Sequence, residues 1–130
     1  MSRIVIVDDS PTIRRMVRSS LAGLPKATFV EAASGLEAIE QLTLGPVGLM
    51  VLDLNMPDMH GIDVLKFVRR NPHYSGIPII VLTTRGDETS RQTAQQAGAT
   101  SYMTKPFAPQ TLAKAVRDLL DTTVDVSARN

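Results

Sequence analysis

The sequence predicts an α/β fold, a doubly wound (βα)5 three-layer sandwich in which helices cover both faces of a five-stranded parallel sheet. The first observation behind this prediction is a set of short, continuous apolar runs rich in β-branched residues, which are typical of strands buried on both faces. The second is that segments with helical spacing of apolar residues follow these runs, so that a strand–helix unit recurs five times at intervals of 20 to 30 residues. Parallel strands joined in this way need right-handed crossovers, which distribute the helices over the two faces of the sheet.

Five runs are interpreted as the strands of this sheet. The strongest three are continuously apolar and do not alternate with polar residues, which distinguishes them from strands with one solvated face. The other two are a mixed run and a short, more polar run. In chain order the five runs are residues 4–7, 28–32, 49–52, 77–82 and 101–104.

Capping signals mark the boundaries of the predicted helices. Ser10 can cap the helix that follows the first strand, and Pro11 suits the first turn of that helix. Ser34 and Glu37 have the spacing of a capping box before the second helix. The third helix is expected to end at Asn71–Pro72, because a residue that precedes proline is disfavoured in the helical conformation.

The two helices nearest the C-terminus differ in apolar content. Residues 112–120 place leucine and valine side chains at helical spacing, whereas residues 86–97 contain no large apolar residue. We therefore expect the helix over residues 86–97 to be held weakly by packing and to shift at low cost. Residues 121–130 lack an apolar face, so we predict a folded domain over residues 1–120 and a short, frayed C-terminal tail over residues 121–130.

The composition fits one globular domain and excludes several classes of function. The chain has 130 residues, of which 43% are hydrophobic and 21% are charged, and its net charge is +1. This charge balance argues against a nucleic-acid-binding protein, and the absence of cysteine excludes a disulfide framework and a thiolate metal site. The longest apolar stretches have five or six residues, so we expect no membrane span. Residues 1–3 run directly into the first strand and leave no room for a signal peptide, so we expect a cytoplasmic protein. We also expect it to be a monomer.

Polar side chains follow four of the five predicted strands at the point where each strand ends. Because the carboxyl ends of parallel strands lie at one edge of the sheet, where such folds bind their ligands, we expect these side chains to meet there. The group consists of three carboxylates, a hydroxyl and an ammonium group, contributed by Asp8, Asp9, Asp53, Thr83 and Lys105.

This group of side chains indicates a site for a metal ion and a phosphoryl group. Carboxylates at close range raise one another's pKa or require a cation, and a cluster of oxygen ligands suits Mg²⁺, which attracts phosphate oxygens. Lys105 adds a compact positive charge and Thr83 adds a hydroxyl donor. No glycine-rich phosphate loop follows the first strand, which argues against a nucleotide held in a P-loop. Asp53, on the central strand, is the candidate nucleophile that would become an aspartyl phosphate.

The chain resembles the receiver domain of two-component response regulators, and within that family the stand-alone chemotaxis regulators. The resemblance covers about residues 3–120 and rests on four motifs at the spacing of the family, which are IVIVDDSPTIRRMVR, LMVLDLNMPDMHG, IIVLTT and AGATSYMTKPF. It implies a flavodoxin-like fold with the strand order 2-1-3-4-5, a detail that the apolar pattern alone does not provide.

The resemblance also implies how the acidic cluster acts. Asp53 looks like the phospho-acceptor of the family. Asp9, Asp53 and the backbone carbonyl of Asn55 would bind Mg²⁺ directly, and Asp8 would act mainly through water. Lys105 would pair with the phosphoryl group, and its bond to the following proline would be cis.

Four further positions match the family's switch and its regulation. Thr83 looks like the switch hydroxyl and Tyr102 like the switch aromatic residue. Arg85 and Asn55 occupy the positions that flank the phosphoryl group and tune its hydrolysis. Thr84 stands where the family usually has a small residue, and its bulk would affect the movement of that loop.

The main hypothesis is a phosphorylation-controlled protein switch. A histidine kinase, or a small acyl or amide phosphate, transfers a phosphoryl group to Asp53 in a Mg²⁺-dependent reaction. Thr83 then moves toward the phosphoryl group, Tyr102 turns inward behind it, and the helix over residues 86–97 changes position. The expected partners are a histidine kinase and a downstream protein, such as a flagellar motor switch or a phosphatase, with chemotaxis or motility as the pathway. We expect the chain to catalyse only its own phosphorylation and dephosphorylation and to act on no other substrate as an enzyme.

Other readings of the same residues stay open at this point. The chain could be a relay intermediate, or a receiver excised from a longer regulator. A Mg²⁺-dependent phosphatase of the haloacid dehalogenase kind would also use Asp53 as nucleophile, but it needs a second aspartate two residues later, where this sequence has Asn55. A flavodoxin-like electron carrier would bind a flavin phosphate beside the acidic loop DDSPT, which repels it.

The remaining residues near these motifs are interpreted as surface, loop or helix-entry positions without a functional role, and Asp58 and Gly61 are the loop and helix-entry residues among them. The histidines lie in polar, turn-like contexts, and the basic residues of the first helix form a solvated face. These residues are His60, His73, Arg14, Arg15, Arg18, Asp58 and Gly61.

Overall fold

The computed structural model describes the backbone of residues 2–128 and the side chains of residues 2–121. Strands and helices alternate throughout. The strands are β1 (Ser2–Val7), β2 (Ala27–Ala32), β3 (Leu49–Leu52), β4 (Ile79–Thr83) and β5 (Ser101–Thr104). The helices are α1 (Pro11–Ser20), α2 (Gly35–Leu44), α3 (Gly61–Arg70), α4 (Glu88–Ala97) and α5 (Pro109–Ala128).

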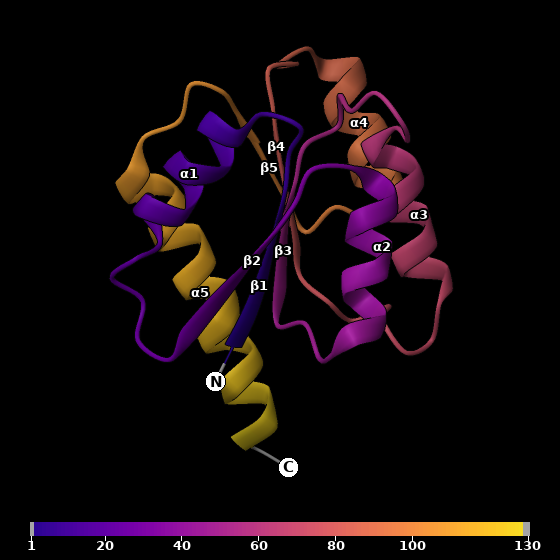
Figure 1. Cartoon of the computed structure of the whole chain (residues 1–130). Coiled ribbons are helices and arrows are strands. Elements are labelled where there is room, and N and C mark those ends of the chain that lie inside the picture. Colours follow the sequence, from indigo (N-terminus) through magenta and orange to yellow (C-terminus); the bar gives the residue numbers. More distant parts are fainter. Residues whose placement is uncertain (1, 129–130) are drawn as a thin grey trace.

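The five strands form one parallel sheet with the order β2-β1-β3-β4-β5. Helices α1 and α5 cover one face of the sheet, and α2, α3 and α4 cover the other (Figure 1). This arrangement confirms the predicted doubly wound α/β fold and the flavodoxin-like strand order that the resemblance implied. It also places the carboxyl ends of all strands at one edge.

The sheet separates two hydrophobic cores. Along β1, Val5 and Val7 face the core beneath α2, α3 and α4, whereas Ile4 and Ile6 face the core beneath α1 and α5. Strand β3 is buried along its whole length. Because successive side chains of a strand point to opposite faces, a strand covered on both sides must be apolar throughout, which explains why the strongest runs do not alternate with polar residues.

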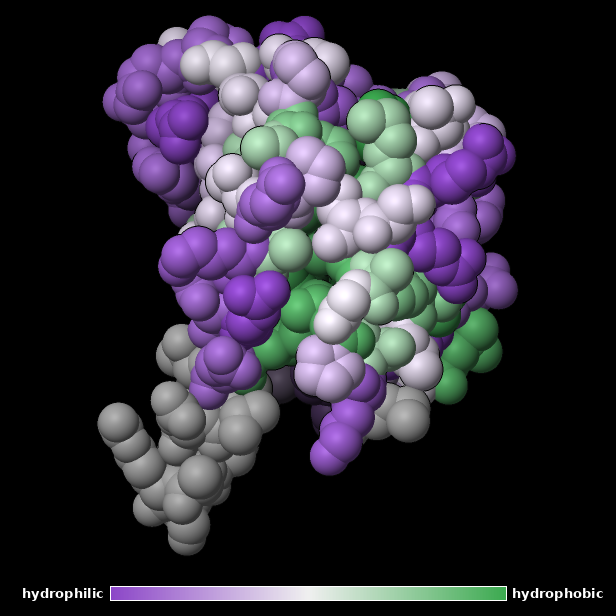
Figure 2. Space-filling view, turned by 90° about the vertical axis from the view of Figure 1, so that its left-hand side faces the viewer, coloured by the Kyte–Doolittle hydropathy of each residue, from purple (hydrophilic) through white to green (hydrophobic). Residues whose placement is uncertain are grey.

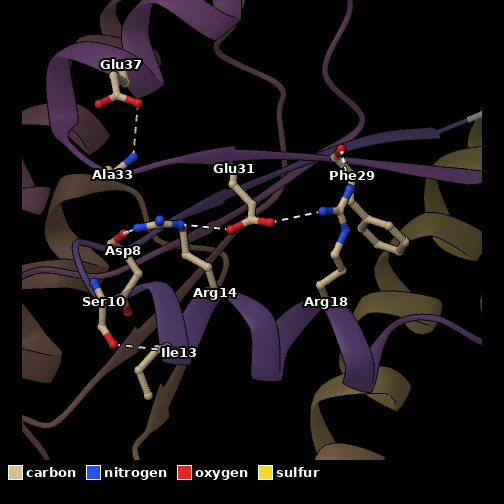
Figure 3. Close-up of polar contacts among 9 residues, drawn as sticks. All are labelled: Asp8, Ser10, Ile13, Arg14, Arg18, Phe29, Glu31, Ala33 and Glu37. Atoms are coloured by element: carbon tan, nitrogen blue, oxygen red, sulfur yellow. Dashed lines mark hydrogen bonds and ion pairs between the residues drawn. The ribbon is translucent and has the colours of Figure 1, made fainter.

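The predicted caps of the first two helices are present. The Ser10 hydroxyl accepts a hydrogen bond from the Ile13 N–H at 3.2 Å, and the Ser34 hydroxyl accepts one from the Glu37 N–H at 3.1 Å. The Glu37 carboxylate accepts a return bond from the Ala33 N–H at 3.3 Å, one residue before the cap (Figure 3). The two serine contacts satisfy N–H groups that the first turn of a helix leaves without partners.

Several element boundaries differ from the sequence prediction. Strands β1 and β2 begin one or two residues earlier than predicted, at Ser2 and Ala27, and β4 ends one residue later, at Thr83. Strand β4 begins at Ile79 rather than at residue 77, because the intervening proline has no N–H to donate to a strand ladder. Helix α4 begins at Glu88 rather than at residue 86, because the Asp87 side chain caps it. Helix α5 continues to Ala128, so the segment predicted as a frayed tail is helical up to that residue, and its last two residues, 129–130, lie outside the described chain.

Helix α4 contributes little to the core, as its composition led us to expect. Ala94 is the only buried residue of this helix. The other side chains of α4 are polar, apart from one further alanine, and leave it with little apolar surface to bury against the sheet. Within residues 2–128, no helix combines the length and the apolar character that crossing a bilayer requires.

Candidate functional site

The carboxyl ends of β1 and β3 bring three carboxylates together. Asp8 follows β1, and its N–H donates to the Ala32 carbonyl at 3.1 Å, while Asp53 follows β3, and its N–H donates to the Val7 carbonyl at 2.9 Å. These bonds extend the sheet by one residue and fix the backbone from which the two side chains project. Carboxylate oxygens of Asp8, Asp9 and Asp53 all lie within 4.8 Å of one another.

Lys105, which follows β5, reaches into this acidic cluster. Its Nζ lies 2.6 Å from Oδ2 of Asp8 and 3.6 Å from Oδ1 of Asp53. Asp8 and Asp53 are only 3% and 4% exposed, whereas Asp9 is open to solvent. Three carboxylates and one ammonium group leave a formal charge of −2 in the cluster, so a further cation would stabilise it.

Burial raises the pKa of Asp53, and the neighbouring Asp8 carboxylate raises it further. The Lys105 ammonium group and a hydrogen bond from the Asn55 backbone act in the opposite direction, but they do not cancel the increase. The Asp53 side chain therefore lies where added positive charge would favour its ionised form.

The donor set of the acidic cluster fits a hard divalent cation. All three groups offer oxygen, which Mg²⁺ prefers, and opposite ligands of an octahedral Mg²⁺ ion lie about 4 Å apart. The span of 4.8 Å within which the carboxylate oxygens lie suits a cation held partly by side chains and partly by water. The cluster could thus bind a metal ion, and Asp8, Asp9 and Asp53 are the side chains that would hold it.

Thr83 lies at the same edge of the sheet and is completely buried. Its hydroxyl oxygen accepts a hydrogen bond from the Arg85 N–H at 3.3 Å and lies 3.5 Å from Nδ2 of Asn55. Its carbonyl accepts the N–H of Lys105 at 2.8 Å. Through these bonds Thr83 connects the segments that follow β3, β4 and β5.

Tyr102 packs behind this segment in a buried position. Its hydroxyl donates to the backbone carbonyl of Arg85, and the Arg91 guanidinium lies 4.8 Å from the centre of its ring, a cation–π contact. Burial raises the pKa of Tyr102, and Asp87 adds to this effect, while the two arginines lower it. The predicted inward turn of this ring would lead to the position that it already occupies here.

Two other predicted positions face solvent. The Arg85 side chain is exposed and lines a cavity of about 140 Å³ together with His60 and Thr89, so its role in phosphoryl hydrolysis stays a prediction. Thr84 is exposed and lines a cavity of about 370 Å³ with Met16. The bond between Lys105 and the following proline is cis, as the resemblance implied.

The interpretation of the α1 arginines as a solvated face is wrong for Arg14 and incomplete for Arg18 (Figure 3). Arg14 Nε lies 2.9 Å from Oε1 of Glu31, and its Nη1 donates to the Asp8 carbonyl at 2.6 Å. Arg18 Nη1 lies 3.0 Å from Oε2 of the same glutamate. Arg15 is exposed, as expected. The available signal was the position of Arg14 near the start of a helix, where a basic residue opposes the helix dipole and needs a compensating contact.

Asp58, interpreted as a simple loop residue, caps helix α2 from outside. Its two carboxylate oxygens accept the N–H groups of Gly35 and Leu36, each at 3.1 Å. Desolvation acts to raise the pKa of Asp58, but the bonds from Leu36 and Gly35 lower it more. This contact joins the loop after β3 to the start of α2, which the sequence could not show because the two segments are distant along the chain.

The start of helix α3 lies directly against the Asp53 backbone. The Gly61 N–H donates to the Leu54 carbonyl at 2.9 Å, and a Cβ atom at position 61 would lie 2.3 Å from the Asp53 carbonyl oxygen. His60 is exposed, as predicted, but its Nδ1 also accepts the Ile62 N–H at 3.1 Å and caps α3. Gly61 therefore has a steric role beyond that of a helix-entry residue, since only a residue without Cβ fits there.

Comparisons with known proteins agree with this fold. A sequence profile of the response regulator receiver domain matches residues 4–117. A chemotaxis protein CheY homolog from Campylobacter jejuni is 39% identical over 121 residues, which cover 92% of this chain and 93% of the relative. The structure of chemotaxis protein CheY4 from Vibrio cholerae is 34% identical, with a TM-score of 0.84 and coverage of 92% of this chain and 98% of that one.

A third similar structure is the Mn²⁺-bound form of response regulator Rcp1, which is 28% identical with a TM-score of 0.77 and coverage of 92% of this chain and 91% of that one. The profile match extends from β1 into α5 and includes every residue of the acidic cluster. The chain therefore belongs to the response regulator receiver domain family.

Proposed function

We propose that the chain is a phosphorylation-controlled response regulator whose Asp53 accepts a phosphoryl group from a histidine kinase in a Mg²⁺-dependent reaction. The observation that carries this proposal is the environment of Asp53, a desolvated carboxylate 3.6 Å from Lys105 and within 4.8 Å of two further carboxylates. A nucleophilic carboxylate needs neighbouring positive charge when an anionic phosphoryl group approaches it. Membership of the receiver family supports the same assignment.

Metal binding and bond formation would share the Asp53 carboxylate, and the other metal ligands would take no part in bond formation. Asp9, Asp53 and the backbone carbonyl of Asn55 would hold Mg²⁺ directly, and Asp8 would hold it through water. When bound, the cation supplies positive charge opposite the oxygens of the incoming phosphoryl group. The relative Rcp1, which has a Mn²⁺-bound form, supports a divalent cation in a receiver of this fold.

In the transfer, an oxygen of Asp53 forms a bond to phosphorus while the bond from phosphorus to the kinase histidine breaks. The released histidine nitrogen takes a proton from solvent. Lys105 Nζ, which lies 2.6 Å from Asp8 before the reaction, is close enough to turn toward a phosphoryl oxygen. The chemistry of the chain itself would be limited to accepting the phosphoryl group and losing it by hydrolysis, with Asn55 and Arg85 tuning the second step.

The new phosphoryl group would shift the molecule between two conformations. It places a charge of about −2 beside Thr83, in place of the −1 of the free Asp53 carboxylate, and the Thr83 hydroxyl can then donate to a phosphoryl oxygen. Because the Arg85 N–H is bonded to this hydroxyl and the Arg85 carbonyl to Tyr102, a movement of Thr83 changes both contacts. The weakly packed α4 follows this segment, so its position would report the phosphorylation state by a population shift.

The partners follow from the family and from the relatives. We propose a histidine kinase as phosphoryl donor and a downstream protein that binds the changed surface, with a flagellar motor switch or a phosphatase as candidates. The C. jejuni and V. cholerae relatives are chemotaxis proteins by name, which supports a role in chemotaxis or motility. We propose a receiver over residues 1–120 that acts in the cytoplasm as a monomer.

Intact-protein mass spectrometry after incubation with acetyl phosphate and Mg²⁺ tests this proposal. The wild-type protein should gain one phosphoryl group, and chelation of Mg²⁺ should prevent the gain. Asp53→Asn should gain no phosphoryl group, because a side-chain amide is a much weaker nucleophile than a carboxylate. Asp58→Asn, which alters an exposed carboxylate of the same loop, should react like the wild type. A phosphoryl adduct on Asp53→Asn would refute the assignment.

A further inference from the structure

Arg14 has an unusual position for a basic residue. It lies near the N-terminus of α1, where positive charge opposes the helix dipole, and the first turn of this helix has no acidic residue. Its side chain is only 15% exposed. Two contacts compensate for this placement, one to Glu31 on β2 and one to the backbone after β1 (Figure 3).

The backbone contact is made at the point where the sheet ends. Strand β1 ends at Val7, so the Asp8 carbonyl lies beyond the last residue of the strand. The Arg14 Nη1 donates to this carbonyl at 2.6 Å. A hydrogen bond from a charged donor is stronger than one between neutral groups, so it restrains the carbonyl direction effectively.

The Asp8 carbonyl belongs to the peptide group that joins Asp8 to Asp9. Because this group is planar, its carbonyl direction also sets the direction in which the chain continues into Asp9. The Asp8 side chain has restraints of its own, from the Ser10 N–H at 2.9 Å and from Lys105. Among the residues that the structure describes, none forms a hydrogen bond or ion pair with the exposed Asp9 carboxylate, so its direction depends on the backbone.

Glu31 weakens the competition between Arg14 and a metal ion. A lone guanidinium beside the acidic cluster would repel a divalent metal ion, but the Glu31 carboxylate, 2.9 Å from Arg14, offsets part of that repulsion. Arg18 contacts the other oxygen of Glu31 from the exposed side and makes no contact with the Asp8 carbonyl. Arg14 and Arg18 thus share the glutamate but differ in their access to the metal site.

We propose that Arg14 is a positioning residue of the metal site, which holds the Asp8–Asp9 peptide so that the Asp9 carboxylate faces Asp8 and Asp53. The inference rests on the proposed function, since it takes the acidic cluster to bind Mg²⁺. It assigns to Arg14 an effect on metal affinity and not on bond formation.

The test compares Arg14→Gln with the matched control Arg18→Gln, which removes the other guanidinium from Glu31. Calorimetric titration with Mg²⁺ should show about tenfold weaker binding for Arg14→Gln, the lower end of the range for loss of a group that orients a metal ligand. The NMR resonance of the Asp9 amide should shift in the metal-free Arg14→Gln protein. Arg18→Gln should leave both measurements unchanged within about twofold.

Unchanged or tighter Mg²⁺ binding by Arg14→Gln would overturn the proposal, and so would an equal loss of affinity in Arg18→Gln. If Arg14→Gln does not fold, Arg14→Lys replaces it. Lysine keeps the charge but has no planar fork that can reach Glu31 and the Asp8 carbonyl together. Wild-type Mg²⁺ affinity in that variant would therefore also contradict the proposal. If the wild-type protein itself binds no Mg²⁺, the proposed function fails, whereas the Asp9 amide shift still decides whether Arg14 positions the peptide.

Discussion

Helices α3 and α4 lie on the same face of the sheet and have the same length, ten residues, yet they are held in place by different interactions (Figure 1). Helix α3 buries apolar side chains over two turns, whereas α4 buries a single alanine. The buried residues are Gly61, Ile62, Val64, Leu65 and Val68 in α3, and Ala94 in α4. This difference in burial predicts that α4 moves more easily than α3, because the core fixes α3 and holds α4 by one small side chain only.

Polar contacts at its two ends hold α4 where packing does not. Asp87 caps its N-terminus, and Gly98 ends it with a φ of 110°, in the left-handed region that favours glycine. Arg69 of α3 donates to the Gly98 carbonyl at 2.8 Å and to the Ile77 carbonyl, before β4, at 2.7 Å. Each of these contacts is individually weaker than the burial of a large side chain, so α4 can shift while α3 stays in place.

The contrast between the helices is not confined to this face. Figure 2 shows the opposite side of the sheet, where apolar side chains gather between α1 and α5 and polar ones lie at the margins. Leu112 and Val116 of α5 are completely buried there. Helix α5 therefore resembles α3 rather than α4 in its mode of attachment.

The largest expected effect is that of a cavity beneath α3. Leu65 is completely buried, so Leu65→Ala should lower the free energy of unfolding by about 3 kcal/mol. Ala94→Gly in α4 should lower it by only about 1 kcal/mol, mainly through helix propensity. Urea denaturation followed by circular dichroism measures both. Equal losses would show that α4 contributes to the core as much as α3 does.

Removal of the arginine that joins the two helices should have an intermediate effect. Burial lowers the pKa of Arg69, and its guanidinium bonds backbone carbonyls on both sides of β4. Arg69→Ala should therefore lower the free energy of unfolding by about 2 kcal/mol and increase amide exchange in α4 more than in α3. The adjacent, exposed Arg70 provides the control, since Arg70→Ala should change stability by less than about 0.5 kcal/mol. A similar loss in both variants would contradict a specific role for Arg69.

The unmodified protein should already show the difference between the helices. Amides in the centre of α4 should exchange at least about tenfold faster than those of α3 and of residues 112–120, which corresponds to an opening free energy lower by ~1.4 kcal/mol. Phosphorylation with acetyl phosphate and Mg²⁺ should change exchange in α4 and leave α3 unaffected. Hydrogen exchange followed by mass spectrometry or NMR provides the measurement. Equal protection in the three segments would refute the comparison.

The smallest effect should come from the cap of α4 at low pH. Hydrogen bonds from the Ser90 N–H and hydroxyl lower the pKa of Asp87. Because this pKa is lower in the folded protein, the ionised cap stabilises α4 at neutral pH, and its contribution is lost as the pH falls below about 4. Asp87→Asn should remove this part of the pH dependence of α4 exchange while keeping a capping side chain. An unchanged pH profile in that variant would exclude Asp87 as its origin.

The sequence predicted the side chains that meet at the strand ends. It did not predict the contacts that helices and loops make with segments distant along the chain. Continuous apolar runs end next to Asp8, Asp53 and Thr83, and a parallel sheet brings strand ends together, so the acidic edge was predictable. The contact between Arg14 and Glu31 joins a helix and a strand from separate parts of the chain. The position of Arg14 near a helix start indicates that it needs a compensating contact, but no local pattern identifies Glu31 as the partner.

The start of α4 also differs from the prediction. The sequence predicts a start at residue 86, but Asp87 caps the helix, because its carboxylate accepts the Ser90 N–H across the first turn. The position of the Tyr102 ring depends on contacts between segments, since its hydroxyl donates to the Arg85 carbonyl and Arg91 packs on the ring. An inward turn of this ring on phosphorylation stays a prediction.

The contact between Gly61 and the Asp53 backbone limits which sequences this loop can accept. A library that varies positions 58 and 61 together, followed by selection for folded protein, should retain different ranges of residue types at the two positions. Position 58 should accept several short side chains that can cap a helix, because Asp58 is exposed and acts through hydrogen bonds alone. Position 61 should retain only glycine, since every other residue would place a Cβ atom 2.3 Å from the Asp53 carbonyl oxygen and force the segment after β3 away from α3.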